Sequence, residues 1–353
     1  MKLEALGYNN EIKNSLDIGL EGLEIGRVIT EHKERYLVQS EKGEFEAEIT
    51  GNLRYTAAGR ADFPAVGDWV ALMVFDTHSA IIHKVLPRFS VLSRKAVGVT
   101  ADIQIIATNI DFAFIVLSVD EDFSLNRMER YLTLCHSSCI QPIIILNKMD
   151  LVAEDRLSEL MGQLKNRFEE IPVLGISAST TQGLKRVREI IEVGKTYCLL
   201  GSSGVGKSTL VNALSQKRLM ETKKVSDYSK KGRHTTTHRE LVVLENGGIL
   251  IDNPGMREVG LPDVSNGLDK TFEDILDLAA HCKFKDCTHT VETGCAVTQA
   301  VESGDIDKSA YENYLKLKRE QVHFDSTIAE KRKKDKDFGK MIKHFKYIKK
   351  SNK

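Results

Sequence analysis

The stretch Gly201-Ser-Ser-Gly-Val-Gly-Lys-Ser208 fills every fixed position of the pattern G-x-x-x-x-G-K-[ST]. Before it, the run Lys195–Leu200 predicts a buried strand, and after it Ser208–Leu214 predicts the start of a helix. A strand, a glycine loop and a helix N-terminus in this order direct backbone N–H groups at one anion. The alternative is a plain glycine turn before a surface helix, and the surrounding context argues against it. The sequence therefore predicts a phosphate-binding loop.

Two residues at the end of this loop have side chains suited to a nucleotide and its metal ion. The Lys207 ammonium would reach the β- and γ-phosphates of a nucleoside triphosphate, and the Ser208 hydroxyl would be a ligand of Mg²⁺. Mg²⁺ is therefore an expected cofactor. The loop residues expected to bind the nucleotide are Gly201, Ser202, Ser203, Gly204, Val205, Gly206, Lys207, Ser208 and Thr209.

A second motif, Asn147-Lys148-Met149-Asp150, lies upstream of the loop and follows Pro142–Leu146, an apolar run that predicts a strand ending at a ligand edge. The Asp150 carboxylate can accept hydrogen bonds from N1 and N2 of guanine, a donor pair that adenine lacks. Such a charged contact contributes about 1.5–3 kcal/mol. Taken alone, the four residues could equally be a turn. Beside a phosphate loop they predict a guanine site.

The order of the two motifs is the reverse of that in an ordinary GTPase, where the phosphate loop comes first. A chain keeps the same pocket with exchanged segments only if the domain is circularly permuted, which domains tolerate when their ends lie close together at the surface. A third apolar run, Ile171–Ala178, ends in Ser177-Ala178, where a backbone N–H is expected to face O6 of guanine. We therefore predict an α/β, circularly permuted GTPase domain that binds GTP and GDP.

Two downstream segments have the composition of nucleotide-sensing switches. In Gly232–Thr237, we expect Thr236 to bind Mg²⁺ and to sense the γ-phosphate, although without the other motifs a polar loop would be preferred. In the second segment, the Asp252 carboxylate is expected to hold a metal-bound water and the Gly255 N–H to contact the γ-phosphate. The next residue, Met256, replaces the glutamine that orients water in Ras-like enzymes, so we expect slow intrinsic hydrolysis.

A cluster of cysteine and histidine has the composition of a metal site: Cys282-x4-Cys287-x-His289-x5-Cys295. Three thiolates and one imidazole are the four ligands that tetrahedral structural Zn²⁺ requires. The spacing is not that of a common zinc finger, and His281 is a rival ligand. We expect one structural zinc that folds a small domain and does no chemistry.

Five short runs near the N-terminus alternate between apolar and polar residues, as strands do. They are Arg27–Thr30, Tyr36–Gln39, Glu44–Ile49, Asp68–Phe75 and Ala80–Leu86. Five short strands favour an OB-fold barrel, a frequent nucleic-acid platform, although any small barrel would give the same pattern. Trp69, the only tryptophan, is expected in the core rather than on a base-stacking surface.

The composition is that of a cytoplasmic protein without a membrane span. The chain has 353 residues and a formal net charge of +0, and no apolar run approaches the roughly 18 residues of a membrane helix. Polar residues interrupt the N-terminal segment where a signal peptide would be apolar. Disulfides are not expected in the cytosol. The cysteines outside the cluster lie in apolar patterns and are expected in the core: Cys135, Cys139 and Cys198.

Positive charge gathers at the C-terminus, where eleven of the 23 residues from Lys331 to Lys353 are Lys or Arg. Apolar residues recur within this tail at roughly helical spacing. The tail is either a solvated helix or an arm that pairs with RNA phosphates.

The motifs in this order resemble the RsgA (YjeQ) family of ribosome small-subunit-dependent GTPases. Three further stretches carry the resemblance: Phe63-Pro-Ala-Val-Gly-Asp-Trp-Val70, Gly232-Arg-His-Thr-Thr-Thr237 and the Cys/His cluster. Asn253 departs from the family, which more often has Thr or Ser there. The resemblance implies that the chain binds the 30S subunit and its 16S rRNA late in assembly and hydrolyses GTP to leave it. It also implies that His234 orients the attacking water.

These observations predict three domains: an OB-fold RNA-binding barrel at 1–95, a permuted GTPase domain at 96–262, and a helical zinc-binding domain with the basic tail at 263–353. We expect a monomer. Because of Met256, a second function stays open, a GTP-dependent RNA-binding scaffold that does not hydrolyse its nucleotide.

Overall fold

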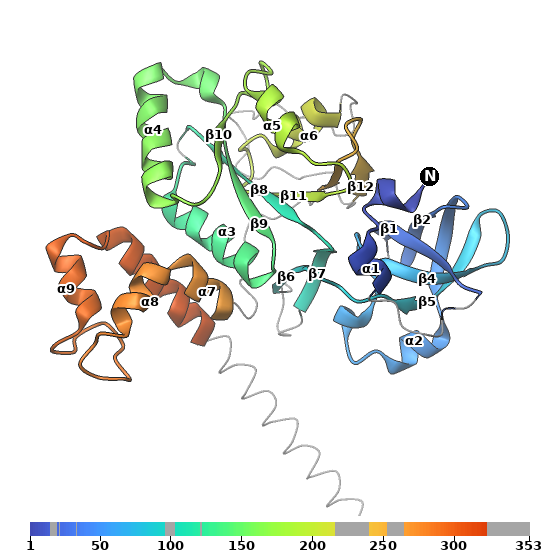
Figure 1. Ribbon diagram of the computed structural model, residues 1–353, viewed down its shortest axis with the longest axis horizontal. Coiled ribbons are helices and arrows are strands. Elements are labelled where there is room, and N and C mark those ends of the chain that lie inside the picture. The colour runs from blue at the N-terminus through green and yellow to red at the C-terminus, as the bar shows by residue number, and fades with distance from the viewer. Residues whose placement is uncertain are drawn as a thin grey trace, which may run out of the picture. The chain divides into compact units, whose positions relative to one another are not determined.

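The structure, a computed structural model shown in Figure 1, describes residues 1–14, 20, 22–32, 34–95, 103–120, 122–215, 240–252 and 265–322. The chain divides into two compact units. The first unit holds Met1–Arg94 and Ile103–Gly260, and the second holds Lys95–Asp102 and Leu261–Lys353.

The N-terminal strands of the first unit close into a five-stranded barrel. They are β1 (Glu24–His32), β2 (Arg35–Ser40), β3 (Glu44–Ile49), β4 (Trp69–Val74) and β5 (Ser79–Val85). The strands β1 to β3 form a meander, β3 pairs in parallel with β5, β5 pairs with β4, and β4 returns to β1. A short α-helix, α2 (Gly51–Thr56), and a 3-10 turn, η2 (Arg60–Asp62), lie between β3 and β4 in the sequence. The prediction of an OB-type barrel is confirmed.

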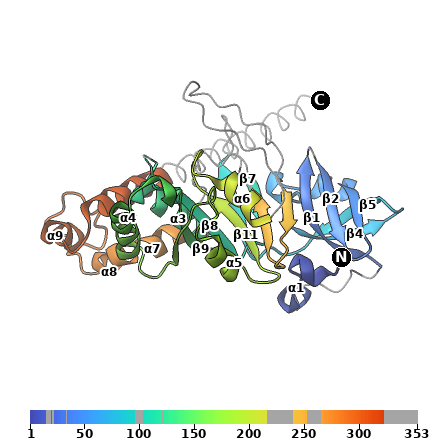
Figure 2. The same ribbon diagram turned by 90° about the horizontal axis from the view of Figure 1, so that it is seen from above.

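Strand alternation separates the interior of the barrel from its outer side. In β3, Phe45, Ala47 and Ile49 are buried and the glutamates between them are exposed. Trp69 is also buried, at 1% exposure, but it packs with the N-terminal segment, where the ring of Tyr8 meets it edge-on at 5.2 Å between centroids. Figure 2 shows α1 (Asn10–Asn14) outside the barrel strands. Trp69 is therefore a core residue, as predicted.

A mostly parallel sheet follows, in the order β10-β9-β8-β11-β13-β12. Its strands are β8 (Phe112–Ser118), β9 (Gln141–Asn147), β10 (Val173–Gly175), β11 (Thr196–Leu200), β12 (Glu240–Val243) and β13 (Ile249–Asp252). Only β12 runs antiparallel to its neighbour among these strands. The strand before the phosphate loop, β11, is central although β8, β9 and β10 precede it in the chain. The sheet thus has the permuted order that the motifs predict.

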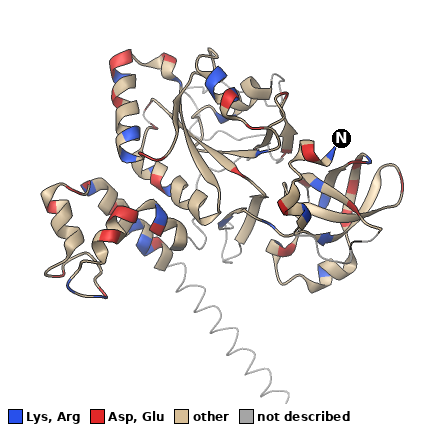
Figure 3. Cartoon of the chain, viewed as in Figure 1, with Lys and Arg blue, Asp and Glu red and all other residues tan. Residues whose placement is uncertain are grey.

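Helices pack against both faces of this sheet. On one face, α5 (Leu184–Ile190) and α6 (Lys207–Ser215) cover a core that includes Val116, Ile145 and Leu199. Against β8 and β9 lies α3 (Leu125–Ser137), and against β10 lies α4 (Glu154–Arg167). Figure 3 shows acidic residues in the first turn of α4 and basic residues in its last turn, the arrangement that the helix dipole favours.

The cysteines of this region follow the prediction with one exception. Cys135 of α3 and Cys198 of β11 are buried free thiols. Cys139 is exposed, so its expected place in the core is wrong. The reason is local, because α3 ends at Ser137 and Cys139 lies in the turn beyond it with a left-handed φ of 57°.

The barrel and the parallel sheet are joined within the first unit. A single residue pair, Thr30 with Glu240, connects β1 to β12 and makes one sheet of eleven strands. Two further strands, β6 (Val91–Lys95) and β7 (Ile103–Thr108), form a separate small sheet.

From residue 265 to 322, the regular elements of the second unit are helices. They are α7 (Ser265–Thr271), α8 (Glu273–Ala279), α9 (Ala296–Ser303) and a helix over residues 308–322, and a loop joins α8 to α9. Phe272 and Tyr314 meet edge-on in its core, with ring centroids 5.4 Å apart. The helical character predicted for this region is confirmed in its described residues. The basic tail from Lys331 lies outside the described residues. In the described ranges, no helix has the length and apolar character needed to cross a membrane.

Candidate nucleotide site and metal centre

The phosphate loop connects β11 to α6, and close contacts require glycine at two of its positions. Gly201, Gly204 and Gly206 have φ angles of 143°, 92° and 98°. A Cβ at Gly201 would lie 2.4 Å from Val116 O, and one at Gly206 would lie 2.3 Å from Asn147 Nδ2. Only glycine allows these approaches. The other predicted loop residues lie between β11 and the first turn of α6: Ser202, Ser203, Val205, Lys207, Ser208 and Thr209.

The Lys207 side chain folds back onto the phosphate loop. Its Nζ donates to Gly201 O at 2.7 Å and to Ser202 O at 2.6 Å. Asp252 lies at the end of the adjacent strand β13. Burial raises the pKa of Asp252 to about 6, although the positive charge of Lys207 opposes this rise. A half-buried carboxylate beside the loop is a suitable place for a cation.

Asn147 connects the guanine motif to the two other nucleotide segments. This buried amide donates from Nδ2 to Val205 O of the phosphate loop at 2.8 Å. Its Oδ1 accepts the Ala178 N–H at 3.0 Å. A backbone N–H of the Ser177-Ala178 segment was expected to face O6 of guanine, and the Ala178 N–H is donated to Asn147 in this structure. Ser177 is buried directly before it.

The rest of the guanine motif presents charge at the same edge of the sheet. Lys148 has a left-handed φ of 63°, and its Nζ lies 2.7 Å from Asp120 Oδ2. Asp150, in the short helix η3 (Met149–Leu151), is exposed. The pocket therefore combines an exposed carboxylate for a base with a glycine loop for phosphates.

A cluster that the sequence analysis did not find holds the tip of the phosphate loop. Ser202 Oγ donates to the Asp122 carboxylate, and Arg127 Nη1 donates to both Asp122 and Ser202, the latter at 3.0 Å. Asp122 follows β8, and Arg127 lies in the first turn of α3. The one available signal was that β8 ends at the same edge as β9 and β11, because parallel strands share their carboxyl edge.

We predict that Arg127 compensates the negative charge of Asp122 beside the phosphate site. Arg127→Ala should weaken GDP binding by about three- to tenfold, a modest effect because both side chains are partly exposed and screened. In the double variant Asp122→Asn with Arg127→Ala, affinity should largely return, because the carboxylate is gone too. Titration with a fluorescent GDP analogue measures both. A double variant no tighter than Arg127→Ala would refute this role.

Three predicted switch residues lie outside the described residues: His234, Thr236 and Gly255. Of the switch predictions, the structure places Asp252 alone.

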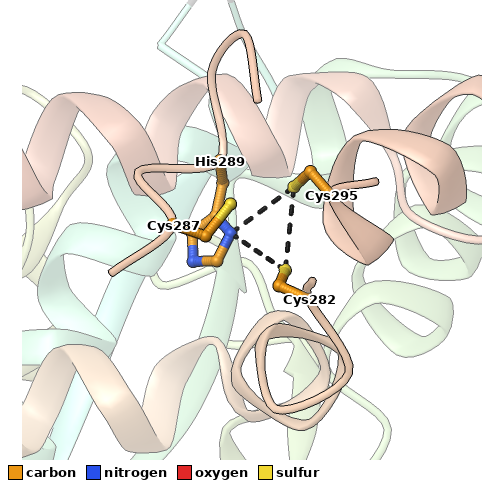
Figure 4. A group of neighbouring side chains, drawn as sticks. All are labelled: Cys282, Cys287, His289 and Cys295. Carbon is orange, nitrogen blue, oxygen red and sulfur yellow. Dashed lines mark hydrogen bonds between the residues drawn. The ribbon is translucent and has the colours of Figure 1, made fainter. Parts of the chain in front are cut away.

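The second unit brings Cys282, Cys287, His289 and Cys295 together, as Figure 4 shows. Their ligand atoms all lie within 4.8 Å of one another. Cys282 Sγ is 3.8 Å from Cys295 Sγ, and His289 Nδ1 is 3.6 Å from each of these sulfurs. Tetrahedral Zn²⁺ with bonds of about 2.3 Å to sulfur sets sulfur pairs about 3.8 Å apart. The cluster therefore fits a tetrahedral metal.

The chain around the cluster fixes the ligands in place. Cys295 is the N-cap of α9, and its Sγ accepts the Thr298 N–H at 3.4 Å. His289 is buried and has a φ of 61°, and Tyr311 donates its hydroxyl to His289 O at 2.5 Å. The rival ligand His281 is not part of the group, because its Nδ1 lies 2.9 Å from Asp277 O of the preceding helix α8.

Known proteins that resemble this chain share the region that contains the guanine motif and the phosphate loop. The family model described as RsgA GTPase matches residues 85–262. A protein of Bacteroides thetaiotaomicron named small ribosomal subunit biogenesis GTPase RsgA 1 is 44% identical over 325 residues, which cover 91% of this chain and 90% of that protein. The chain belongs to the RsgA GTPase family. The family resemblance inferred from the motifs is thereby confirmed, and the chain is a circularly permuted GTPase.

Other RsgA relatives agree in sequence and in structure. A protein of the same name from Oceanobacillus iheyensis is 41% identical over 90% of each chain. The crystal structure of YjeQ from Thermotoga maritima aligns with a TM-score of 0.64 and 27% identity, over 85% of this chain and 99% of that one. YloQ, described as a circularly permuted GTPase, aligns with a TM-score of 0.63 and 26% identity, over 87% of this chain and 98% of that one.

A model described as ABC transporter also matches, at residues 184–346. This range shares the phosphate loop with the RsgA match. It leaves out the guanine motif at Asn147, so the phosphate loop alone does not distinguish the two families, whereas the guanine motif does.

Proposed function

We propose that this chain binds GTP, hydrolyses it to GDP and phosphate when it meets the small (30S) ribosomal subunit, and acts in late maturation of that subunit. One observation carries the proposal: relatives that match nine-tenths of the chain are named small ribosomal subunit biogenesis GTPases. The pocket agrees with it, because Asn147 joins a guanine motif to a phosphate loop.

In the proposed reaction, the phosphate loop holds and neutralises the nucleotide. Lys207 turns from the loop carbonyls to the β- and γ-phosphates, and the N–H groups from Gly201 to Ser208 surround the β-phosphate. Mg²⁺, held by Ser208 and Thr236 with Asp252 on one of its waters, would supply further positive charge at the transferred phosphate. Gly255 would contact the γ-phosphate.

Guanine selectivity is assigned to the exposed Asp150 carboxylate, with Asn147 fixing the loop that carries it and Lys148 beside the base. The Ser177-Ala178 segment would supply a backbone N–H to O6. Asn147 already bonds the Ala178 N–H, so this contact requires either sharing that donor or using the following N–H.

The remaining parts of the proposal concern place and partners. We assign the chain to the cytoplasm, as a monomer, with the barrel at 1–95 and the basic tail as the regions that contact 16S rRNA. The permuted domain at 96–262 would carry the nucleotide and the region at 263–353 the zinc. Zn²⁺ is the proposed metal of the Cys3His cluster, because thiolate and imidazole ligands in tetrahedral geometry favour it.

Turnover in the presence of small subunits tests this function. Phosphate release from GTP is measured with and without purified 30S particles, and we expect strong stimulation. A GTP-dependent scaffold would bind both ligands and release no phosphate in either case. That result would replace the enzyme by the alternative function.

We further predict that His234→Ala abolishes the stimulated rate while leaving GTP and subunit affinity intact. Met256 cannot orient water, so another group must do so, and His234 is the nearest candidate by chemistry. The expected rate falls by about 10²-fold or more, the usual contribution of general acid–base catalysis. A stimulated rate within a few-fold of the parent would leave water positioning to the backbone or to the ribosome.

A further inference from the structure

A buried arginine connects the barrel to the strand that carries the phosphate loop. Arg27 lies on β1 and is 1% exposed. Its Nε donates to Gly67 O of the barrel at 3.1 Å and its Nη2 to Asn109 O at 2.9 Å. Its Nη1 donates to Leu6 O at 2.5 Å and to Thr196 Oγ1, the first residue of β11, at 3.0 Å.

This junction is costly to separate. Burial lowers the pKa of Arg27 to about 10, partly opposed by the charges of Asp111 and Asp68. Among the described residues, no carboxylate forms an ion pair with Arg27. Its positive charge is therefore stabilised by hydrogen bonds to carbonyl and hydroxyl oxygens. Moving the barrel away from β11 would separate the buried guanidinium from two of its acceptors, Asn109 O and Thr196 Oγ1, and leave part of its charge without a partner.

The start of β11 is held by a second group as well. Asp111 accepts the Thr196 N–H at 2.9 Å and the Lys195 ammonium at 2.8 Å. Hydrogen bonds to β8 and β13 hold the strand on both sides. The strand ends at Leu200, and the phosphate loop begins at the next residue, Gly201, five residues after Thr196. Because an extended strand in a sheet does not stretch, a shift of Thr196 along its axis must move the loop.

We propose that Arg27 is a positioning residue, which passes a displacement of the RNA-binding barrel through Thr196 and β11 to the phosphate loop. The inference rests on the proposed function, since the small subunit is the ligand that would displace the barrel. It assigns part of the subunit's stimulation of GTP hydrolysis to this one buried link. It also explains why Arg27, a basic residue of the barrel, directs its guanidinium at the nucleotide domain rather than at RNA.

Thr196→Val tests the link with little change of shape. Valine keeps the branched side chain that suits a strand, and removes only the hydroxyl that accepts from Arg27. The matched control is Thr133→Val, which removes an equally buried hydroxyl from α3, where it donates to Glu129 O. Three quantities are measured for each variant: GTP turnover without subunits, turnover at saturating 30S particles, and the 30S concentration that gives half-maximal stimulation.

We expect Thr196→Val to retain turnover without subunits and the half-maximal 30S concentration within about twofold. Its maximal stimulated rate should fall at least fivefold, while Thr133→Val stays near the parent. Arg27→Met, which keeps much of the buried volume, should show the same pattern more strongly. Full stimulation of Thr196→Val would overturn the proposal, and so would an equal loss with and without subunits, which would mean a purely structural role. Absence of stimulation in the parent chain would instead overturn the proposed function.

Discussion

Cys287→Ser will release the zinc that we propose for the second unit and unfold the helices around it, with GTP binding left in place. Serine is a poor ligand for Zn²⁺, and three remaining ligands leave the tetrahedron open. In zinc-finger peptides the binding of structural Zn²⁺ contributes about 10–16 kcal/mol, which is also the free energy that folds them. The buried core of this unit is small, so the metal is expected to decide whether it folds.

The measurement is the zinc content per chain, together with helical circular dichroism and GDP affinity. Parent protein should carry one zinc per chain, and the variant close to none. Cys139→Ser is the matched control, because Cys139 is exposed and lies outside the cluster. A parent protein that is fully folded without metal would contradict the assignment.

Asp150→Asn will weaken GTP binding by about 10- to 150-fold, which corresponds to the 1.5–3 kcal/mol of a charged hydrogen bond. The asparagine amide can offer one acceptor, but it loses the charge and places a donor opposite the guanine donors. Xanthine nucleotides, which carry an oxygen at position 2, should bind relatively better because the amide can donate to it.

Competition between GTP, XTP and ATP for a fluorescent nucleotide gives these affinities. Asp155→Asn serves as the control, because it removes an exposed carboxylate from the first turn of α4 without touching the guanine motif. Equal GTP affinity in Asp150→Asn would remove Asp150 from the base site.

The parts of the fold that follow from local patterns could be predicted from the sequence. Alternation gave the five barrel strands to within a few residues, and the apolar runs before Asn147 and Gly201 gave β9 and β11. The grouping of the cluster from Cys282 to Cys295 followed from ligand chemistry, which depends on residue type more than on long-range packing. The order of the motifs predicted the permutation, because each motif follows a strand of the parallel sheet. The order of the motifs along the chain is therefore the order of those strands along the chain.

Contacts between segments far apart in the chain could not be predicted in this way. Arg27 looks like a polar residue of an alternating strand, and nothing nearby in the sequence reveals that it reaches Thr196. The bond from Ala178 to Asn147 also depends on how two loops approach each other. The exposure of Cys139 was missed because a helical pattern does not mark the residue at which a helix ends.

The position of β11 has a consequence for synthesis of the chain. Its neighbour β8 is buried along nearly its whole length in the folded protein, yet it leaves the ribosome before β11 exists. At a synthesis rate of about 5–20 residues per second, β8 lacks its partner strand β11 for roughly 4–16 seconds. An open, apolar strand edge is prone to pair with other chains. In the later part of that interval the nascent chain has its guanine loop but lacks its phosphate loop, so nucleotide cannot yet stabilise it.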